Sequence, residues 1–134
     1  LPRDLHQEYG ITVAAVVPSG GGNFRDLPRS GGGVLTASWF HYGLDGDYSQ
    51  ESDYIDAKAD LAGAVETGEN DLAAEWHWDG SAAWYVRNTR SLSQEGRVRF
   101  RISTYKGMGH STGPVYHDPK VLDWLFAQRA VPVW

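Results

Sequence analysis

The chain has 134 residues, of which 41% are hydrophobic and 22% are charged, and its formal net charge is −5 at pH 7. This length and composition predict one globular domain over residues 1–134 and exclude a disordered chain. No apolar run is long enough to span a bilayer, and the scattered charges of both signs form no basic stripe, so we expect neither a membrane nor a nucleic acid as partner.

The first half of the chain predicts a helix, a strand, a long loop and a second strand. Residues 1–10 are typical of the end of a helix, closed by Gly10. Residues 11–17 form a short run rich in β-branched side chains and stopped by Pro18, which predicts a strand buried on both faces. Residues 19–33, six of them glycine, predict a loop, and residues 34–42 predict the second strand.

The second half predicts alternating helices and strands. We expect a short helix at 53–61, a strand at 62–67, a turn at 68–71, a helix at 81–94 and a strand at 97–104. A glycine-rich turn follows at 106–113. Asp118 as N-cap and Pro119 at the first helical position predict a final amphipathic helix. This alternation indicates an α/β fold with a mostly parallel sheet and flanking helices.

Two loops at predicted strand ends carry residue types suited to acid–base chemistry. Asp71 ends the turn after the strand at 62–67, and His110 lies in the glycine-rich turn after the strand at 97–104. Ligands of open α/β sheets bind at the carboxyl ends of strands. A carboxylate and an imidazole on neighbouring strand ends can hydrogen-bond, so that the acid orients the histidine during general-base catalysis.

Several stretches resemble the C-terminal half of an α/β-hydrolase of the esterase or polyester-depolymerase kind. They are ITVAAVVPSGGG, AVETGENDL, RVRFRISTYKGMGHS and DPKVLDWLFAQRA, which together cover nearly the whole chain. The resemblance implies a partial α/β-hydrolase-type sheet and a triad in the order serine, acid, histidine. It assigns His110 as the general base and acid and Asp71 as the residue that orients it. Asp71 matches a G-x-x-D turn, whereas Lys106 stands where proline is usual before the histidine.

A second acid stays open beside Asp71. The stretch HYGLDGD at 41–47 also follows a predicted strand and resembles another form of the acid turn, which makes Asp47 the reserve acid. We favour Asp71 because one helix and one strand fit between it and His110, as a β-α-β unit requires.

The nucleophile of such a triad is missing from the expected place. Residues 1–10 contain no serine, so we expect the serine and the oxyanion hole on an N-terminal segment or a second chain, and the isolated chain to be inactive. The sequence GHSTG at 109–113 matches G-x-S-x-G and offers Ser111. Pro114 and Pro119 argue against it, because the nucleophile turn must run directly into a helix.

The sequence therefore favours part of a secreted or periplasmic serine hydrolase acting on small or polymeric esters. The alternative is a processed or degenerate hydrolase fragment that binds or assembles without catalysis. Trp76 and Trp78 either line a substrate cleft or pack, and a weaker third interpretation is a carbohydrate-binding module built on them. We expect no cofactor and no metal: cysteine is absent, and neither the histidine spacing nor the acidic stretch at 45–56 matches a known metal motif.

Overall fold

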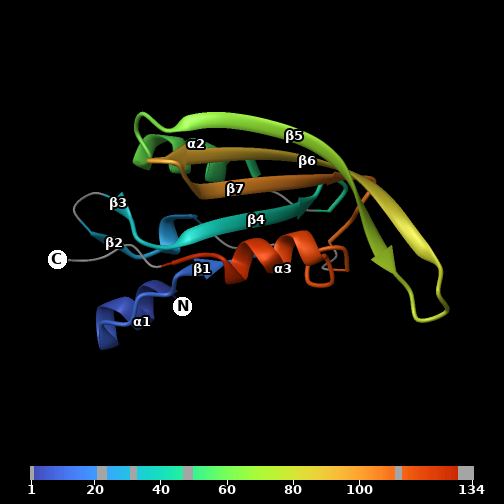
Figure 1. The fold of residues 1–134 in the computed structure, drawn as a ribbon, viewed down its shortest axis with the longest axis horizontal. Helices are drawn as coiled ribbons and strands as arrows, with labels where there is room; N and C mark the ends of the chain where they lie inside the picture. Colours follow the sequence, from blue (N-terminus) through green and yellow to red (C-terminus); the bar gives the residue numbers. More distant parts are fainter. Residues whose placement is uncertain (1, 21–23, 31–32, 47–49, 111–112, 130–134) are drawn as a thin grey trace.

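A five-stranded mixed sheet is the centre of the protein (Figure 1). The computed structural model describes residues 2–20, 24–30, 33–46, 50–110 and 113–129. The strand order is β1-β4-β7-β6-β5, and the strands are β1 (Ala15–Val16), β4 (Ala37–Gly43), β7 (Arg97–Lys106), β6 (Ala82–Gln94) and β5 (Val65–Trp76). The first three are parallel to one another, whereas β6 and β5 are antiparallel to their neighbours.

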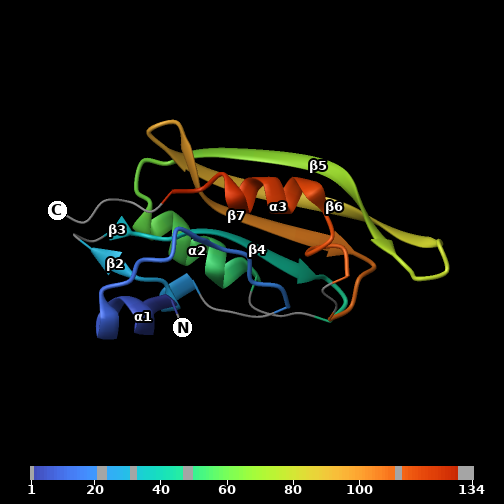
Figure 2. The ribbon, with the colours of Figure 1, turned by 60° about the horizontal axis from the view of Figure 1, so that its bottom comes forward.

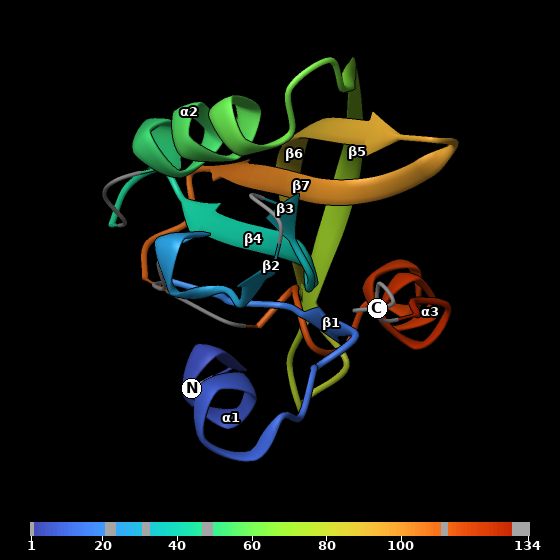
Figure 3. The same cartoon turned by 90° about the vertical axis from the view of Figure 1, so that its left-hand side faces the viewer.

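Helices cover both faces of this sheet. Helix α2 (Gln50–Asp60) lies on one face and α3 (Pro119–Phe126) on the other (Figure 3). The remaining described elements are α1 (Pro2–Tyr9), the 3-10 turn η1 (Phe24–Asp26) and a two-stranded ribbon of β2 (Arg29–Ser30) and β3 (Gly33–Val34). In the described part of the chain, no helix has both the length and the apolar character needed to cross a membrane.

Each face of the sheet has its own core because side chains alternate along a strand. Phe40 of β4 and Phe100 of β7 pack with Tyr54 of α2 on one face. Trp39 is one residue from Phe40 and Tyr105 is five residues from Phe100, so both side chains point to the opposite face, where they pack with Val121 of α3. Strand β4 is buried along its whole length, which makes it the rigid centre to which the loops at its carboxyl end are attached.

The prediction of a mostly parallel sheet, as in a partial α/β-hydrolase fold, is wrong. Residues 81–94, expected as a helix, form the antiparallel strand β6, and residues 68–71, expected as a turn, lie inside β5. The buried positions of β6 alternate along the strand but are occupied by the polar residues Arg87, Thr89 and Ser91. The sequence therefore lacks the alternation of apolar and polar residues by which a strand is usually predicted. Two of the four strand pairings in the sheet are therefore antiparallel, and β6 runs against the other four strands.

Other predicted elements are confirmed. Strands β4 and β7, helices α1 and α2 and the final helix lie close to their expected bounds. Gly10 follows α1 with φ +69°, the left-handed conformation expected of a helix-closing glycine. Asp118 caps α3, its side chain accepting a hydrogen bond from the Lys120 amide, and Pro119 occupies the first turn.

Candidate functional site

The turn that carries His110 lies at the carboxyl edge of the parallel strands. Strand β4 pairs with β7 from Ser38 to Gly43, so both strands end at the same edge of the sheet. Ser19, which follows β1, forms a parallel bridge with His41 near that edge. The loops after β1, β4 and β7 therefore converge in one place, which Figure 2 shows for β4 and β7.

Three glycines lie where these loops contact one another most closely. A Cβ atom on Gly43 would lie 2.0 Å from the carbonyl oxygen of Gly109, and one on Gly46 would lie 2.5 Å from the His110 amide nitrogen. A Cβ on Gly20 would lie 2.6 Å from Cε1 of the His110 ring. Real Cβ contacts are not this short, so the loops after β1 and β4 can pack against the His110 turn only because these positions lack a side chain.

Hydrogen bonds hold the same turn to the loop after β4. The Asp45 amide donates to the Met108 carbonyl over 2.9 Å, and the Leu44 amide donates to the Tyr105 carbonyl over 3.1 Å. Asp45 is exposed beside the turn. The reserve acid Asp47 and the serine of the GHSTG motif, Ser111, lie outside the described residues.

The structure does not bring Asp71 to His110. Asp71 lies within β5, and Arg87 of β6 donates to both of its carboxylate oxygens over 2.9 and 2.6 Å. Lys120 of α3 adds a third bond of 3.2 Å. These cations, Arg87 foremost, hold the pKa of Asp71 below its ordinary value. Strand β6 separates β5, which carries Asp71, from β7, which leads into the His110 turn. Asp71 instead takes part in an ion-pair network on the α3 face of the sheet.

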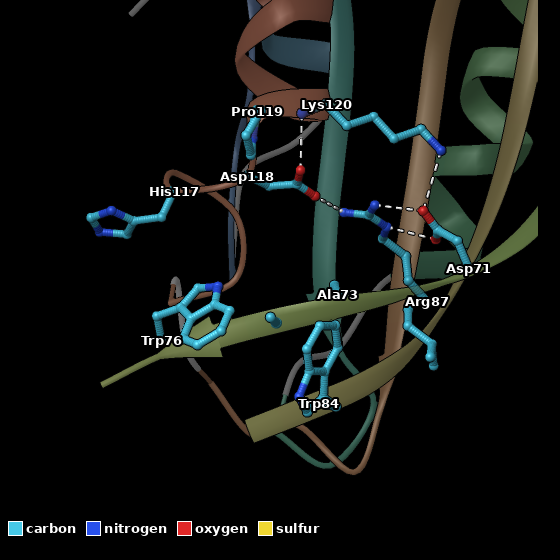
Figure 4. A pocket seen from close by; sticks show the side chains of 11 residues that line it. Asp71, Ala73, Trp76, Trp84, Arg87, His117, Asp118, Pro119 and Lys120 are labelled. Carbon is cyan, nitrogen blue, oxygen red and sulfur yellow. Dashed lines mark hydrogen bonds and ion pairs between the residues drawn. The ribbon is translucent and has the colours of Figure 1, made fainter. Parts of the chain in front are cut away.

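That network borders a hollow of about 290 Å³ between the β5–β6 hairpin and the start of α3 (Figure 4). Arg87 also donates to Asp118 over 2.6 Å, so one guanidinium joins two carboxylates. Burial alone lowers the pKa of Arg87, but hydrogen bonds to Asp71, Tyr105 and Asp118 outweigh it and raise that pKa above its ordinary value.

Two exposed indoles line the same hollow. Trp76 of β5 and Trp84 of β6 are 63% and 60% exposed, and their rings meet edge to face with centroids 6.2 Å apart. Trp78, predicted with Trp76 as a lining residue, is 99% exposed in the hairpin connection and is not among the lining residues. Sequence reasoning missed Trp84 and Arg87 because both fell in the expected helix; the strand-favouring side chains of Trp84, Tyr85, Val86 and Thr89 were the available signal.

A buried histidine lies one strand away from this network. The His41 side chain is fully buried on β4, its Nδ1 is 2.7 Å from the Tyr105 hydroxyl, and its ring stacks on Trp39. Burial, with a smaller contribution from Arg87 and Arg101, holds the pKa of His41 well below 6.5. Burial also raises the pKa of Tyr105 to about 12. Both rings are therefore neutral at physiological pH.

Comparisons with known proteins identify no relative. Scans against protein-family models, curated protein sequences and solved structures each return no match. Among the described residues, no group of three or more histidine or carboxylate side chains is placed to hold a metal ion.

Proposed function

We propose that this chain supplies the general-base histidine, His110, of a serine-type hydrolase that acts on esters. The observation that carries the proposal is the convergence of three loops on His110 at the carboxyl edge of β1, β4 and β7. Catalytic side chains are commonly held at this edge of parallel strands. The resemblance of the His110 turn to the histidine turn of esterases adds to this support.

The loop after β4 is the source of the carboxylate in this proposal. Asp45 and Asp47 both belong to it, and its described part is bonded directly to the His110 turn through Met108. A carboxylate there would bond one ring nitrogen, leaving the other to accept the proton of a serine hydroxyl and return it to the leaving alcohol. Asp71 is left out of this mechanism because Arg87 and Lys120 occupy its oxygens.

The serine and the oxyanion-hole amides come from outside residues 1–134 in this mechanism. His110 would lower the barrier by proton transfer, and the backbone amides beside the serine would stabilise the tetrahedral oxyanion. The ester substrate would then meet His110 from the side where the three loops end.

A fluorophosphonate probe tests the proposal, because it labels only activated serines. The protein is purified with every segment or chain that accompanies it in its source, labelled and read by mass spectrometry. We expect a labelled serine outside these 134 residues and loss of the label in His110→Ala. We also expect strong loss in either Asp45→Asn or Asp47→Asn, and retention in Asp71→Asn.

Three results would overturn this assignment. One is the absence of any label on the assembled protein, which would favour the non-catalytic fragment. Another is labelling that survives His110→Ala. The third is a label on Ser111, which would place the nucleophile within this chain. Circular dichroism of each variant separates a lost catalytic group from a lost fold.

A further inference from the structure

The hollow between the β5–β6 hairpin and α3 has a chemistry distinct from the His110 edge. Residues Ala82–Tyr85 of β6 pair with β5 alone, because the pairing of β6 with β7 begins at Val86 (Figure 1). The hairpin therefore projects past the sheet and carries the Trp76 and Trp84 rings with it. In Figure 4 these two indoles lie on one side of the hollow, and the ion pairs among Asp71, Arg87, Asp118 and Lys120 lie on the other.

The charges of the hollow oppose an ionic ligand. Two carboxylates, Asp71 and Asp118, are balanced by two cations, Arg87 and Lys120, and each carboxylate is hydrogen-bonded to a cation. An incoming anion would meet both carboxylates, and an incoming cation would meet Arg87 and Lys120. A neutral ligand with hydroxyl groups meets neither penalty, because a hydroxyl both donates and accepts hydrogen bonds.

The exposed indoles select the shape of that ligand. Two tryptophans that keep more than half of their surface in water cost free energy unless something apolar covers them. The C–H face of a pyranose ring is apolar and flat, whereas its rim carries hydroxyls. A sugar ring can therefore lie on an indole while its hydroxyls reach the charged wall opposite.

We propose that this hollow binds a neutral pyranose unit of a glycan, which stacks on the face of one of the two indoles, Trp76 or Trp84, with the other indole at its edge and the ion-pair wall as the hydroxyl-binding surface. About 290 Å³ accommodates a small ring ligand at an open site. The segment after the His110 turn passes this hairpin, since a Cβ on Gly113 would lie 2.4 Å from the Glu75 side chain. If the proposed function holds, this site deepens it by naming a glycan-borne ester as the substrate class.

A glycan array followed by titration calorimetry tests the site on the full chain. The array carries neutral oligosaccharides, including xylohexaose, cellohexaose and mannohexaose, together with anionic oligogalacturonate. We expect binding of a neutral oligosaccharide and at least about a tenfold rise in Kd for Trp76→Ala and for Trp84→Ala. Trp84→Phe, which keeps an aromatic face, should recover part of the affinity.

Trp78→Ala is the matched control, because Trp78 belongs to the same hairpin but does not line the hollow. Its Kd should stay within about twofold of the parent value. The proposal is overturned if no neutral glycan binds, if only oligogalacturonate binds, or if Trp78→Ala weakens binding as much as Trp84→Ala.

His110→Ala separates this site from the proposed hydrolase. The variant should bind the glycan with unchanged Kd while losing fluorophosphonate labelling. Glycan binding without labelling would overturn the proposed function alone. Labelling without glycan binding would overturn the sugar site alone.

Discussion

Arg87 and Asp118 are bonded over 2.6 Å and join the middle of β6 to the first turn of α3. The Arg87 side chain is only 2% exposed, and the Asp118 carboxylate also caps α3 by accepting from the Lys120 amide. The same guanidinium holds Asp71 of β5. One buried cation therefore fixes the position of a helix relative to two strands, and the hollow beside it depends on that cation.

Replacing Arg87 with methionine should destabilise the fold by about 3–5 kcal/mol, because Asp71 and Asp118 would lose their buried partner. Equilibrium urea unfolding measures the change in the free energy of unfolding. Arg97→Met is the matched control: Arg97 is exposed on β7, so the loss there should stay within about 0.5 kcal/mol. Equal effects of the two substitutions would contradict a structural role for the Arg87 network.

Acid should weaken the fold through His41. Its pKa in the folded protein lies well below 6.5, so the unfolded chain takes up the proton first as pH falls. The free energy of unfolding is therefore unaffected by the titration of His41 well above pH 6.5. Below pH 6.5 it falls with decreasing pH, because the unfolded chain binds one proton more at His41 than the folded protein does. Between pH 7.5 and 5.5 we expect this one residue to lower the free energy of unfolding by an amount on the order of 1 kcal/mol.

Urea unfolding of the parent, His41→Phe and His117→Gln at both pH values checks this contribution. His41→Phe should remove most of the pH-dependent difference, whatever its effect on overall stability. His117 is exposed, so His117→Gln should leave the difference unchanged. A pH dependence that survives in His41→Phe would show that other groups cause it.

Elements with strong local signals were predicted well from the sequence. Helix α3 begins at the expected place because Asp118 and Pro119 are start signals that act locally. Strand β7 alternates Phe100 and Ile102 with polar residues, and one face is indeed buried against α2. In both cases the residues that determine the element lie within it.

The β5–β6 hairpin could not be predicted in the same way, because its stability comes from partners distant in sequence. Arg87, Thr89 and Ser91 are buried through bonds and contacts to other strands and to α3, not through apolarity. The sequence predicts a turn that starts at Gly68, but pairing with Arg90 keeps the chain extended there. The assignment of Asp71 to a strand end depended on that turn, whereas the His110 turn follows the correctly predicted β7.

Hydrogen exchange distinguishes the observed hairpin from the helix expected at 81–94. Strand β6 is paired on both sides from Val86 to Ser93, so its amides should exchange slowly up to the register shift between Leu92 and Ser93. Strand β5 is an edge strand, and we expect every second amide to exchange fast because it points away from β6. NOEs between Leu72 and Val86, which are register partners, complete the measurement. Uniform protection of β5 would show that another strand covers this edge.

Gly43→Ala should disturb the His110 turn without any change to His110 itself. The added methyl would lie 2.0 Å from the Gly109 carbonyl oxygen and 2.5 Å from that of Met108, and both are backbone atoms that cannot rotate away. We expect a loss of about 1–3 kcal/mol in the free energy of unfolding, typical of an overpacked site. The NMR signals of His110 should shift as the turn moves.

Gly68→Ala is the control for a glycine replaced within the same sheet. A methyl there meets only the Thr89 carbonyl at 3.8 Å, an ordinary contact, and the backbone of β5 accepts any residue. Removing the flexibility of glycine from the unfolded chain should leave stability unchanged or raise it by up to about 1 kcal/mol. If Gly43→Ala proves as harmless as Gly68→Ala, the loops after β4 and β7 do not pack as closely as the structure has them, and the convergence on His110 loses its main support.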